Sequence, residues 1–386
     1  MSFSGGLVNF FLSDIFYVNY ATPIADVPEG ILYIPALANI APIAWALGAD
    51  IYLDTIDQAF LKSLEEIKQR MRRLFPTFSF ESDIIPKKIV KHDFGCVNSA
   101  QLFTGGLDSM ATYIRHKAES PHLIAIANYL QFLNPKLQTI INREFSCFAQ
   151  KGNLKLHTME SNLLMFVDSK RLASQFGSGP QASGVSEFWW IAVQFGLGML
   201  GLCAPLTAIF RLGKLYIASS NTYSMITSPW QPLGSHRDID NHVAWADTRA
   251  YHDIGELTRQ EKIRYIIKPY VKETGSSLKF IVCNNRSRGE VLNCSHCGKC
   301  RRTIVGLALD GLDPRQHGFE VSQKTFLETM RMVQLTSGGG EGCLSSRATE
   351  LDRNMWDDIQ RAIPEELSHD IFGPRWFFEW LRALKD

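Results

Sequence analysis

The sequence carries almost no excess charge of either sign. Its 386 residues include 40 Lys and Arg against 39 Asp and Glu, which gives a formal net charge of +1. A broad, non-specific surface for nucleic acid needs a large basic excess, so this balance disfavours nucleic acid as a partner. Charged residues make up 20% and apolar residues 45% of the chain, a composition typical of globular proteins with a buried core.

The sequence also lacks a clear signal for export or for a membrane anchor. No basic region precedes the apolar residues 8–12, as it would in a secretory signal peptide. The longest uncharged run, residues 188–210, has the length of a membrane helix, but it contains Pro205 and three glycines and ends directly before Arg211. We therefore expect this run to form a helix buried against a sheet, in a cytoplasmic protein with no membrane partner.

Four of the eight cysteines are scattered, which fits a reducing compartment, and the other four lie close together. The second group consists of Cys283, Cys294, Cys297 and Cys300, within eighteen residues. Two-residue gaps let neighbouring thiolates converge on one ion, and the longer loop supplies a fourth ligand, so the spacing predicts a tetrahedral Zn²⁺ site. The adjacent Lys299, Arg301 and Arg302 are expected to favour thiolates over thiols. An iron–sulfur cluster and disulfide bonds remain alternatives.

A glycine pair joins an apolar run to a predicted helix over residues 108–117. Gly105 and Gly106 let the backbone turn close to an anion, because no Cβ stands in the way. Asp108 and Ser109 then fall in the first helical turn, where free N–H groups and the helix dipole attract phosphate. The lysine of a Walker A loop is missing, so Mg²⁺ and remote Lys or Arg would have to balance the phosphate charge. The alternative is that the segment only caps a helix after a turn.

The loop Thr-Gly-Gly-Leu-Asp-Ser at residues 104–109 resembles the Ser-Gly-Gly-x-Asp-Ser loop of the PP-loop ATP pyrophosphatases, with Thr104 in place of serine. The order of the two motifs, with a Cys…Cys-x-x-Cys-x-x-Cys cluster after the loop, is similar to the 7-cyano-7-deazaguanine synthase branch of that family. The resemblance covers about residues 97 to 309 and includes two weaker segments, residues 215–221 and 255–263.

The resemblance implies that ATP is cleaved between its α- and β-phosphates with Mg²⁺, and that an acceptor carboxylate becomes adenylated while pyrophosphate leaves. It implies a 7-carboxy-7-deazaguanine-like acceptor, and an amide or nitrile as the product. The loop residues that would bind the nucleotide are Thr104, Gly105, Gly106, Leu107, Asp108 and Ser109, and the catalytic ones among them are Asp108 and Ser109. Weaker candidates for charge neutralisation, catalysis or base recognition are Lys262, Arg259, His236, Arg237, Asp238, Asp240 and Glu187.

Alternating strand and helix patterns predict an α/β domain with a parallel sheet and helices on both faces over residues 96–311. Its strands are expected near residues 102–103, 123–128, 154–159 and 215–219, and its helices at 108–117, 136–150 and 186–202. Residues 1–95 are expected to form an α+β domain, with strands at 15–20, 30–33 and 50–53 and an amphipathic helix at 60–75. Residues 312–386 are expected to be helical, with helices at 322–335 and 352–361.

About 95 residues precede the phosphate loop, which is more than a minimal deazaguanine synthase needs. The addition suggests a changed acceptor or a protein partner that binds this region. Similar proteins with extra domains are associated with anti-phage defence, and some of them conjugate the deazaguanine carboxylate to a protein amine. Three hypotheses therefore remain: an amide or nitrile synthase, a ligase that acts on a protein amine, and a nucleotide-binding interaction protein without turnover. The oligomeric state is open, with a homodimer as one alternative.

Overall fold

The computed structural model describes residues 5–76, 79–127, 135–175, 189–223, 234–285, 289–337 and 355–384. Its contacts divide the chain into two units that are each assembled from separate segments. The first unit comprises Met1–Phe103, His116–Tyr129 and Cys147–Gly255, and the second comprises Thr104–Arg115, Leu130–Ser146 and Glu256–Asp386. The units do not follow the order of the chain, and the domain boundaries given above stay predictions.

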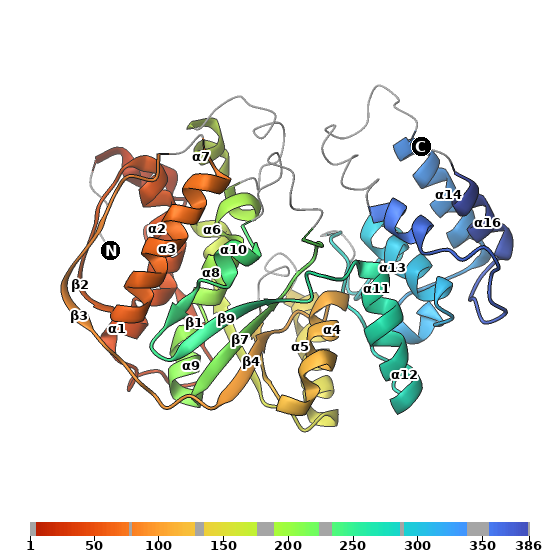
Figure 1. The fold of residues 1–386 in the computed structure, drawn as a ribbon, viewed down its shortest axis with the longest axis horizontal. Coiled ribbons are helices and arrows are strands. Elements are labelled where there is room, and N and C mark those ends of the chain that lie inside the picture. The colour runs from red at the N-terminus through yellow and green to blue at the C-terminus, as the bar shows by residue number, and fades with distance from the viewer. Residues whose placement is uncertain are drawn as a thin grey trace. The chain divides into compact units, whose positions relative to one another are not determined.

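The first unit is built around a seven-stranded sheet with the strand order β1-β6-β5-β4-β7-β9-β8 (Figure 1). The strands are β1 (Val18–Tyr20), β4 (Asn98–Leu102), β5 (His122–Ile126), β6 (Leu156–Ser161), β7 (Leu212–Ala218), β8 (Ala244–Trp245) and β9 (Thr248–Asp253). The five inner strands run parallel, and β1 and β8 pair antiparallel at the two edges. The expectation of an α/β fold with a mostly parallel sheet flanked by helices is confirmed.

Burial explains why the central strands read as continuous apolar runs. Every residue of β5 is buried, and so are four of the five residues of β4, because both faces of these parallel strands are covered. From β4 the chain proceeds to β5 and β6 on one side, and it returns to β7 and β9 on the other side. Such a reversal of strand order marks the place where open parallel sheets bind ligands, at the carboxyl ends of the strands. Thr104 follows the end of β4 by two residues.

The helices of the first unit include α1 (Glu29–Leu32), α2 (Ile34–Leu47), α3 (Gln58–Leu74), α6 (Leu163–Phe166), α7 (Ser169–Gln175), α8 (Phe195–Gly201), α9 (Ala204–Phe210) and α10 (Arg237–Asp240). Two of them, α2 and α3, are long and come from the N-terminal part of the chain. Helix α2 packs against α8, where Gly201 lies so close that a Cβ would come within 2.2 Å of the Cβ of Ala38. Helices α2 and α3 share one hydrophobic core with the sheet. A separate pair of parallel strands, β2 (Ile51–Asp57) and β3 (Ile84–Val90), completes this unit.

The long uncharged run forms several short helices in place of one long helix. A π-helical turn at Trp190–Gln194 leads into α8, and α9 follows with Pro205 in its first turn. Residues 186–188 of the predicted helix lie outside the described part of the chain. Among the described residues, no helix is both long enough and apolar enough to cross a membrane.

The strand predicted at residues 30–33 is wrong, because residues 30–32 belong to α1 and Tyr33 is the C-cap of this helix. Pro28 precedes this helix and Glu29 occupies its first turn, both of which favour a helix start. Gly30 packs so tightly that a Cβ would lie 3.2 Å from the backbone nitrogen of Asp57. Short buried apolar runs carry no periodicity that separates helix from strand, which explains the error.

The second unit is mainly helical. Its helices include α4 (Leu107–His116), α11 (Arg259–Lys262), α12 (Lys268–Thr274), α13 (Gly298–Leu309), α14 (Gln323–Ser337) and α16 (Arg375–Ala383), and residues 355–361 are also helical. Helix α5 (Pro135–Lys151) contributes its first part to this unit. Phe326 of α14 packs on Phe377 and Phe378 of α16 in a core that also contains Val305 of α13. The helix predicted at 322–335 is confirmed as α14. Residues 355–361 of the helix predicted at 352–361 are helical, and residues 352–354 lie outside the described part of the chain.

The buried pair His122 and His157 makes the stability of the protein depend on pH. Their ring nitrogens lie 3.0 Å apart, and burial, with His157 and Lys155 nearby, lowers the pKa of His122 to about 4. The unfolded chain binds a proton at His122 below its ordinary pKa of about 6.5, whereas the folded chain does not. We therefore expect the free energy of unfolding to fall as the pH is lowered from about 6.5 to about 4. His122→Gln should reduce this fall in urea-unfolding experiments, whereas His369→Gln, at an exposed position, should not. Equal pH dependence in both variants would contradict the assignment.

Candidate functional site

The glycine pair at the start of the second unit forms a tight turn against the segment that leads to the first clustered cysteine. Gly105 has a φ of +67°, and a Cβ there would lie 2.8 Å from the ring of Phe145 and 3.2 Å from the side chain of Ile281. The carbonyl of Gly105 accepts a hydrogen bond of 2.9 Å from the N–H of Ile281. Both conformation and space therefore restrict this position to glycine.

Two hydroxyl groups converge at this turn. The Oγ1 of Thr104 lies 3.3 Å from the Oγ of Ser109, and it accepts a hydrogen bond of 3.3 Å from the N–H of Gly106. Ser109 also donates to the carbonyl of Gly106 and accepts from the N–H of Thr104. The methyl group that threonine adds is accommodated at an exposed position, so the hydroxyl is kept in place. The loop thus presents hydroxyls and the first N–H groups of α4 together.

Asp108 lies at the start of α4 and is paired with two cations from α11. Its Oδ2 accepts from Arg259 at 2.6 Å, and its Oδ1 accepts from Lys262 at 3.1 Å. The side chain of Lys262 is fully buried, so this is a desolvated contact. Burial alone would raise the pKa of Asp108, but Arg259, Lys262 and Lys299 outweigh burial and lower it. Both oxygens take part in these pairs, so Asp108 holds Arg259 and Lys262 in place.

The start of α11 explains how the two cations reach the same carboxylate. Thr258 caps the helix by accepting from the N–H of Glu261, and Glu261 accepts in return from the N–H of Thr258. This capping box fixes the first turn, and Arg259 and Lys262 are spaced three apart on one face. The structure therefore brings Arg259 and Lys262, both weaker sequence candidates, to Asp108 of the glycine loop.

Several charged groups interact at this site. Arg259, Lys262 and Lys299 all interact with the carboxylate of Asp108, while Glu256 adds negative charge near Lys262 and Cys297 adds negative charge near Lys299. Burial and the nearby Arg259 lower the pKa of Lys299 to about 8. Burial also lowers the pKa of Lys262, even though Asp108 acts in the opposite direction. An anion bound here would accept charge-assisted hydrogen bonds from these cations.

The four clustered cysteines converge as the spacing predicted. The Sγ atoms of Cys283, Cys294, Cys297 and Cys300 all lie within 4.8 Å of one another. The distances Cys283–Cys297 and Cys294–Cys300 are 3.9 and 4.0 Å. Tetrahedral Zn²⁺ with Zn–S bonds of about 2.3 Å requires sulfurs about 3.8 Å apart, so the donor set fits one such ion. Hydrogen bonds with Cys283 and Cys300 lower the pKa of the Cys297 thiol, and the same contacts raise the pKa of the Cys283 and Cys300 thiols.

The competing interpretations of the cluster fit less well. A disulfide bond would bring two sulfurs to about 2 Å, half the distances found here. An iron–sulfur cluster places several irons and sulfides between its cysteines, which spreads the sulfurs further apart than a single ion does. A metal ion such as Zn²⁺ is therefore the occupant that the geometry favours. Among the described residues, this is the one His, Cys, Asp or Glu group arranged to bind a metal.

The expectation that Arg301 favours thiolates is corrected by its position. Its side chain is buried and donates to the carbonyl of His296 at 2.9 Å, to Thr329 at 2.9 Å and to Glu328 at 2.7 Å. Arg301 thus fastens the cysteine loop to α14 and is not directed at the sulfurs. Lys299 does interact electrostatically with Cys297, as expected.

The remaining sequence candidates lie elsewhere. His236 and Asp238 belong to the first unit, where His236 caps the short helix α10. Asp240 accepts from Ser235 at 2.7 Å and from the buried His252 of β9 at 2.8 Å. The only indication of His252 in the sequence is its position in the alternating pattern of β9, which places it on the buried face. The guanidinium of Arg237 stacks on the ring of Tyr223 at 4.7 Å. Glu187 lies outside the described residues.

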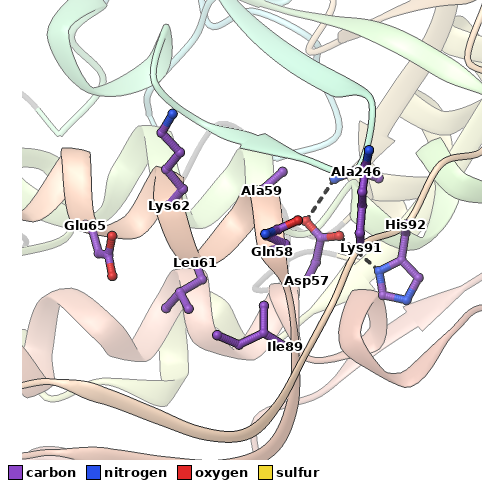
Figure 2. A pocket seen from close by; sticks show the side chains of 10 residues that line it. All are labelled: Asp57, Gln58, Ala59, Leu61, Lys62, Glu65, Ile89, Lys91, His92 and Ala246. Carbon is purple, nitrogen blue, oxygen red and sulfur yellow. Dashed lines mark hydrogen bonds and ion pairs between the residues drawn. The ribbon is translucent and has the colours of Figure 1, made fainter.

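Figure 2 shows a pocket of about 420 Å³ in the first unit, which the sequence did not indicate. At its edge the buried Asp57 accepts from the N–H groups of Phe60 and Ala246 and pairs with Nδ1 of His92, each at 2.9 Å. These contacts join β2, α3 and the turn before β9, so Asp57 has a structural role in holding these elements together. The wall carries two lysines and one glutamate without a common orientation, so the pocket does not define a ligand.

Comparison with protein-family models, with curated proteins and with solved structures finds no significant match to this chain. The resemblance to PP-loop enzymes therefore stays a prediction that rests on the sequence motifs.

We expect the purified protein to contain one zinc ion per chain, since four thiolates fill a tetrahedral shell. Cys297→Ser should abolish stoichiometric zinc binding and lower the melting temperature, because metal affinity contributes to folding. Cys147→Ser, at an exposed position outside the cluster, serves as the control and should leave both unchanged. Elemental analysis and thermal unfolding test this. Iron with a visible absorption band after anaerobic purification would contradict it.

Replacing Asp57 with alanine should destabilise the first unit. The change removes a helix cap and leaves buried N–H groups without an acceptor, so the free energy of unfolding should fall by about 2–4 kcal/mol. Asp54→Ala is a matched control in the same strand, since its partner Lys87 is exposed, and it should cost less than about 1 kcal/mol. If urea unfolding gave the same loss of unfolding free energy for both variants, the structural role of Asp57 would be refuted.

Proposed function

We propose that this chain is an ATP-dependent carbon–nitrogen ligase of the PP-loop type. It adenylates the carboxylate of a 7-carboxy-7-deazaguanine-like compound, releases pyrophosphate, and transfers the acyl group to an amine, giving an amide. With ammonia as the amine, a second ATP adenylates the amide oxygen, and loss of AMP and a proton then gives the nitrile. The supporting observation is that the glycine loop and its two hydroxyls lie beside Asp108, which holds Arg259 and Lys262. Pyrophosphate carries several negative charges, so it can accept charge-assisted hydrogen bonds from these cations and from the loop.

The proposed adenylation and acyl transfer need few side chains that donate or accept a proton. An acceptor carboxylate oxygen attacks the α-phosphorus of ATP, the bond between the α- and β-phosphates breaks, and pyrophosphate leaves with the bond electrons. The amine then attacks the acyl carbon, AMP leaves, and the amine loses its proton to solvent or a base. The loop N–H groups and the cations stabilise the departing pyrophosphate, and Asp108 keeps Arg259 and Lys262 in position. Mg²⁺ would neutralise further phosphate charge, and the described residues supply no carboxylate set for it.

A protein amine is the second candidate acceptor of the acyl group. The support comes from the extra N-terminal residues, since a small-molecule synthase has no evident need for them. Helices α2 and α3 lie in the same hydrophobic core as β4 and β7, so deleting residues 1–95 would remove part of that core. The experiment that identifies the amine should therefore use the full-length protein, with intact-mass analysis of the proteins co-expressed with it. A nucleotide-binding protein without turnover remains the third candidate, and product analysis separates it from the two enzymes.

With ATP and 7-carboxy-7-deazaguanine, the protein should form AMP and pyrophosphate. Asp108→Asn and Ser109→Ala should lower the rate by about 100-fold or more, because each disturbs the pyrophosphate site. Asp313→Asn is the control, since Asp313 is paired with the exposed Arg315 and should be neutral. Chromatography of the nucleotides measures the rate, and circular dichroism checks folding.

Two results would contradict this proposal. ADP and phosphate as products would exclude cleavage between the α- and β-phosphates. Equal stimulation by guanine, which has no carboxylate to activate, would exclude the proposed acceptor.

A further inference from the structure

The last residue of α4 is a histidine that lies between two carboxylates. Nδ1 of His116 is 3.2 Å from Oε1 of Glu119, and Nε2 is 3.3 Å from Oδ1 of Asp253, the last residue of β9. All three residues belong to the first unit, and the side chains of His116 and Asp253 are only 17% and 11% exposed. Since a neutral imidazole has one N–H and can donate to only one acceptor, the two contacts together require the imidazolium form. We call these three side chains the His116 bridge.

The surroundings of the His116 bridge favour the charged ring. The imidazole stacks on the ring of Tyr216 of β7 with the centroids 3.8 Å apart, and the Tyr216 hydroxyl donates to Glu119 at 3.0 Å. Lys214 of β7 lies 3.4 Å from the other oxygen of Glu119, and Tyr251 of β9 packs beside Tyr216. Burial alone would lower the pKa of His116, but its two carboxylate partners outweigh burial and raise it above the ordinary value of about 6.5. The dipole of α4 also favours a positive charge at its C-terminal end.

The His116 bridge holds one end of a helix whose other end carries the glycine loop. At the first turn of α4, Asp108 pairs with Arg259 and Lys262 of α11. At the last turn, His116 pairs with Asp253, which comes shortly before Arg259 in the sequence. The chain that follows β9 is therefore attached to α4 at both ends of this helix. Because α4 is one uninterrupted helix, a shift of its last turn also moves its first turn.

Loss of the proton from His116 removes one of the two contacts. The neutral ring keeps an N–H toward one carboxylate and directs a lone pair toward the other, and a lone pair repels a carboxylate oxygen. Either Glu119 or Asp253 then moves away, so the His116 bridge has two discrete states. In the neutral state the last turn of α4 is less firmly held, while the pairs of Asp108 at the first turn remain.

We propose that His116 is a positioning residue for the glycine loop, and that its protonation switches the loop from weak to strong binding of pyrophosphate. This inference rests on the proposed function for the identity of the anion and adds control by pH. When both ends of α4 are held, the loop loses less conformational freedom on binding the anion. Because the folded pKa of His116 is raised, the His116 bridge is complete below about pH 6.5 and is lost as the pH rises through that folded pKa.

The state of the His116 bridge can be measured without any ligand. Nuclear magnetic resonance titration of the imidazole signals, with His116 assigned by the signal missing in His116→Gln, should give a pKa above about 6.5. Asp253→Asn should lower this pKa, because it removes one negative partner. A pKa at or below the ordinary value in the unchanged protein would contradict the charged bridge.

The effect on the loop is tested by isothermal titration calorimetry with inorganic pyrophosphate between about pH 6 and pH 8.5. At the lower pH, His116→Gln should bind about tenfold more weakly than the unchanged protein, and the ratio of the two affinities should approach one at the higher pH. Using this ratio cancels the ionisation of pyrophosphate itself. His116→Arg, whose charge is permanent and whose guanidinium can stack on Tyr216, should bind strongly at both pH values. His369→Gln, at an exposed position, is the matched control and should follow the unchanged protein.

The outcomes separate the switch from the proposed function. Pyrophosphate binding with an affinity ratio that does not change with pH would overturn the switch and leave the proposed function intact. Equal affinities of His116→Gln and the unchanged protein at about pH 6 would overturn the positioning role as well. Absence of pyrophosphate binding at every pH would refute the proposed function and this inference together. If His116→Gln does not fold, the unchanged protein and His116→Arg decide, because their affinities should agree at the lower pH and differ about tenfold at the higher pH.

Discussion

The buried contact between Asp108 and its cations is the interaction on which the second unit depends. It connects the first turn of α4 to α11, across 154 positions of sequence. A fully buried ammonium group such as that of Lys262 is very unfavourable without a partner, so Asp108 is needed for the fold of this unit as well as for any anion site. The same contact holds Arg259 and Lys262 beside the glycine loop.

Local patterns made much of the fold predictable. Four of the five inner strands, β4, β5, β6 and β7, and the long helices α3, α4, α5 and α14 were found where hydrophobic runs and periodicity indicated, because each of these elements is long or bounded by clear turns. The inner strand β9 and helices such as α13 and α16 were not predicted. The failure at α1 came from a run too short to carry a period. The joining of β1 to β6 and the packing of α2 on α8 could not be predicted, since both depend on contacts between distant segments.

The candidate site was predictable in its parts and not in its assembly. The glycine pair and the cysteine spacing are local signals, and both led to the residues that the structure brings together. The pairing of Arg259 with Asp108, and of Arg301 with Glu328 in place of the sulfurs, depends on tertiary contacts that the sequence does not indicate. His252 and Asp57 were missed for the same reason, because a polar residue at a buried strand position looks ordinary until its partner is known.

The interleaving of the two units has a consequence for synthesis on the ribosome. The strand β4 and the segment from Thr104 to Arg115 are made early, but the residues that pair with Asp108 come 154 positions later. At about 5–20 residues per second, that interval lasts on the order of ten seconds or more. During this time the carboxylate of Asp108 lacks both of the cations that pair with it in the finished protein. The second unit can therefore be completed only after its C-terminal segments have been made.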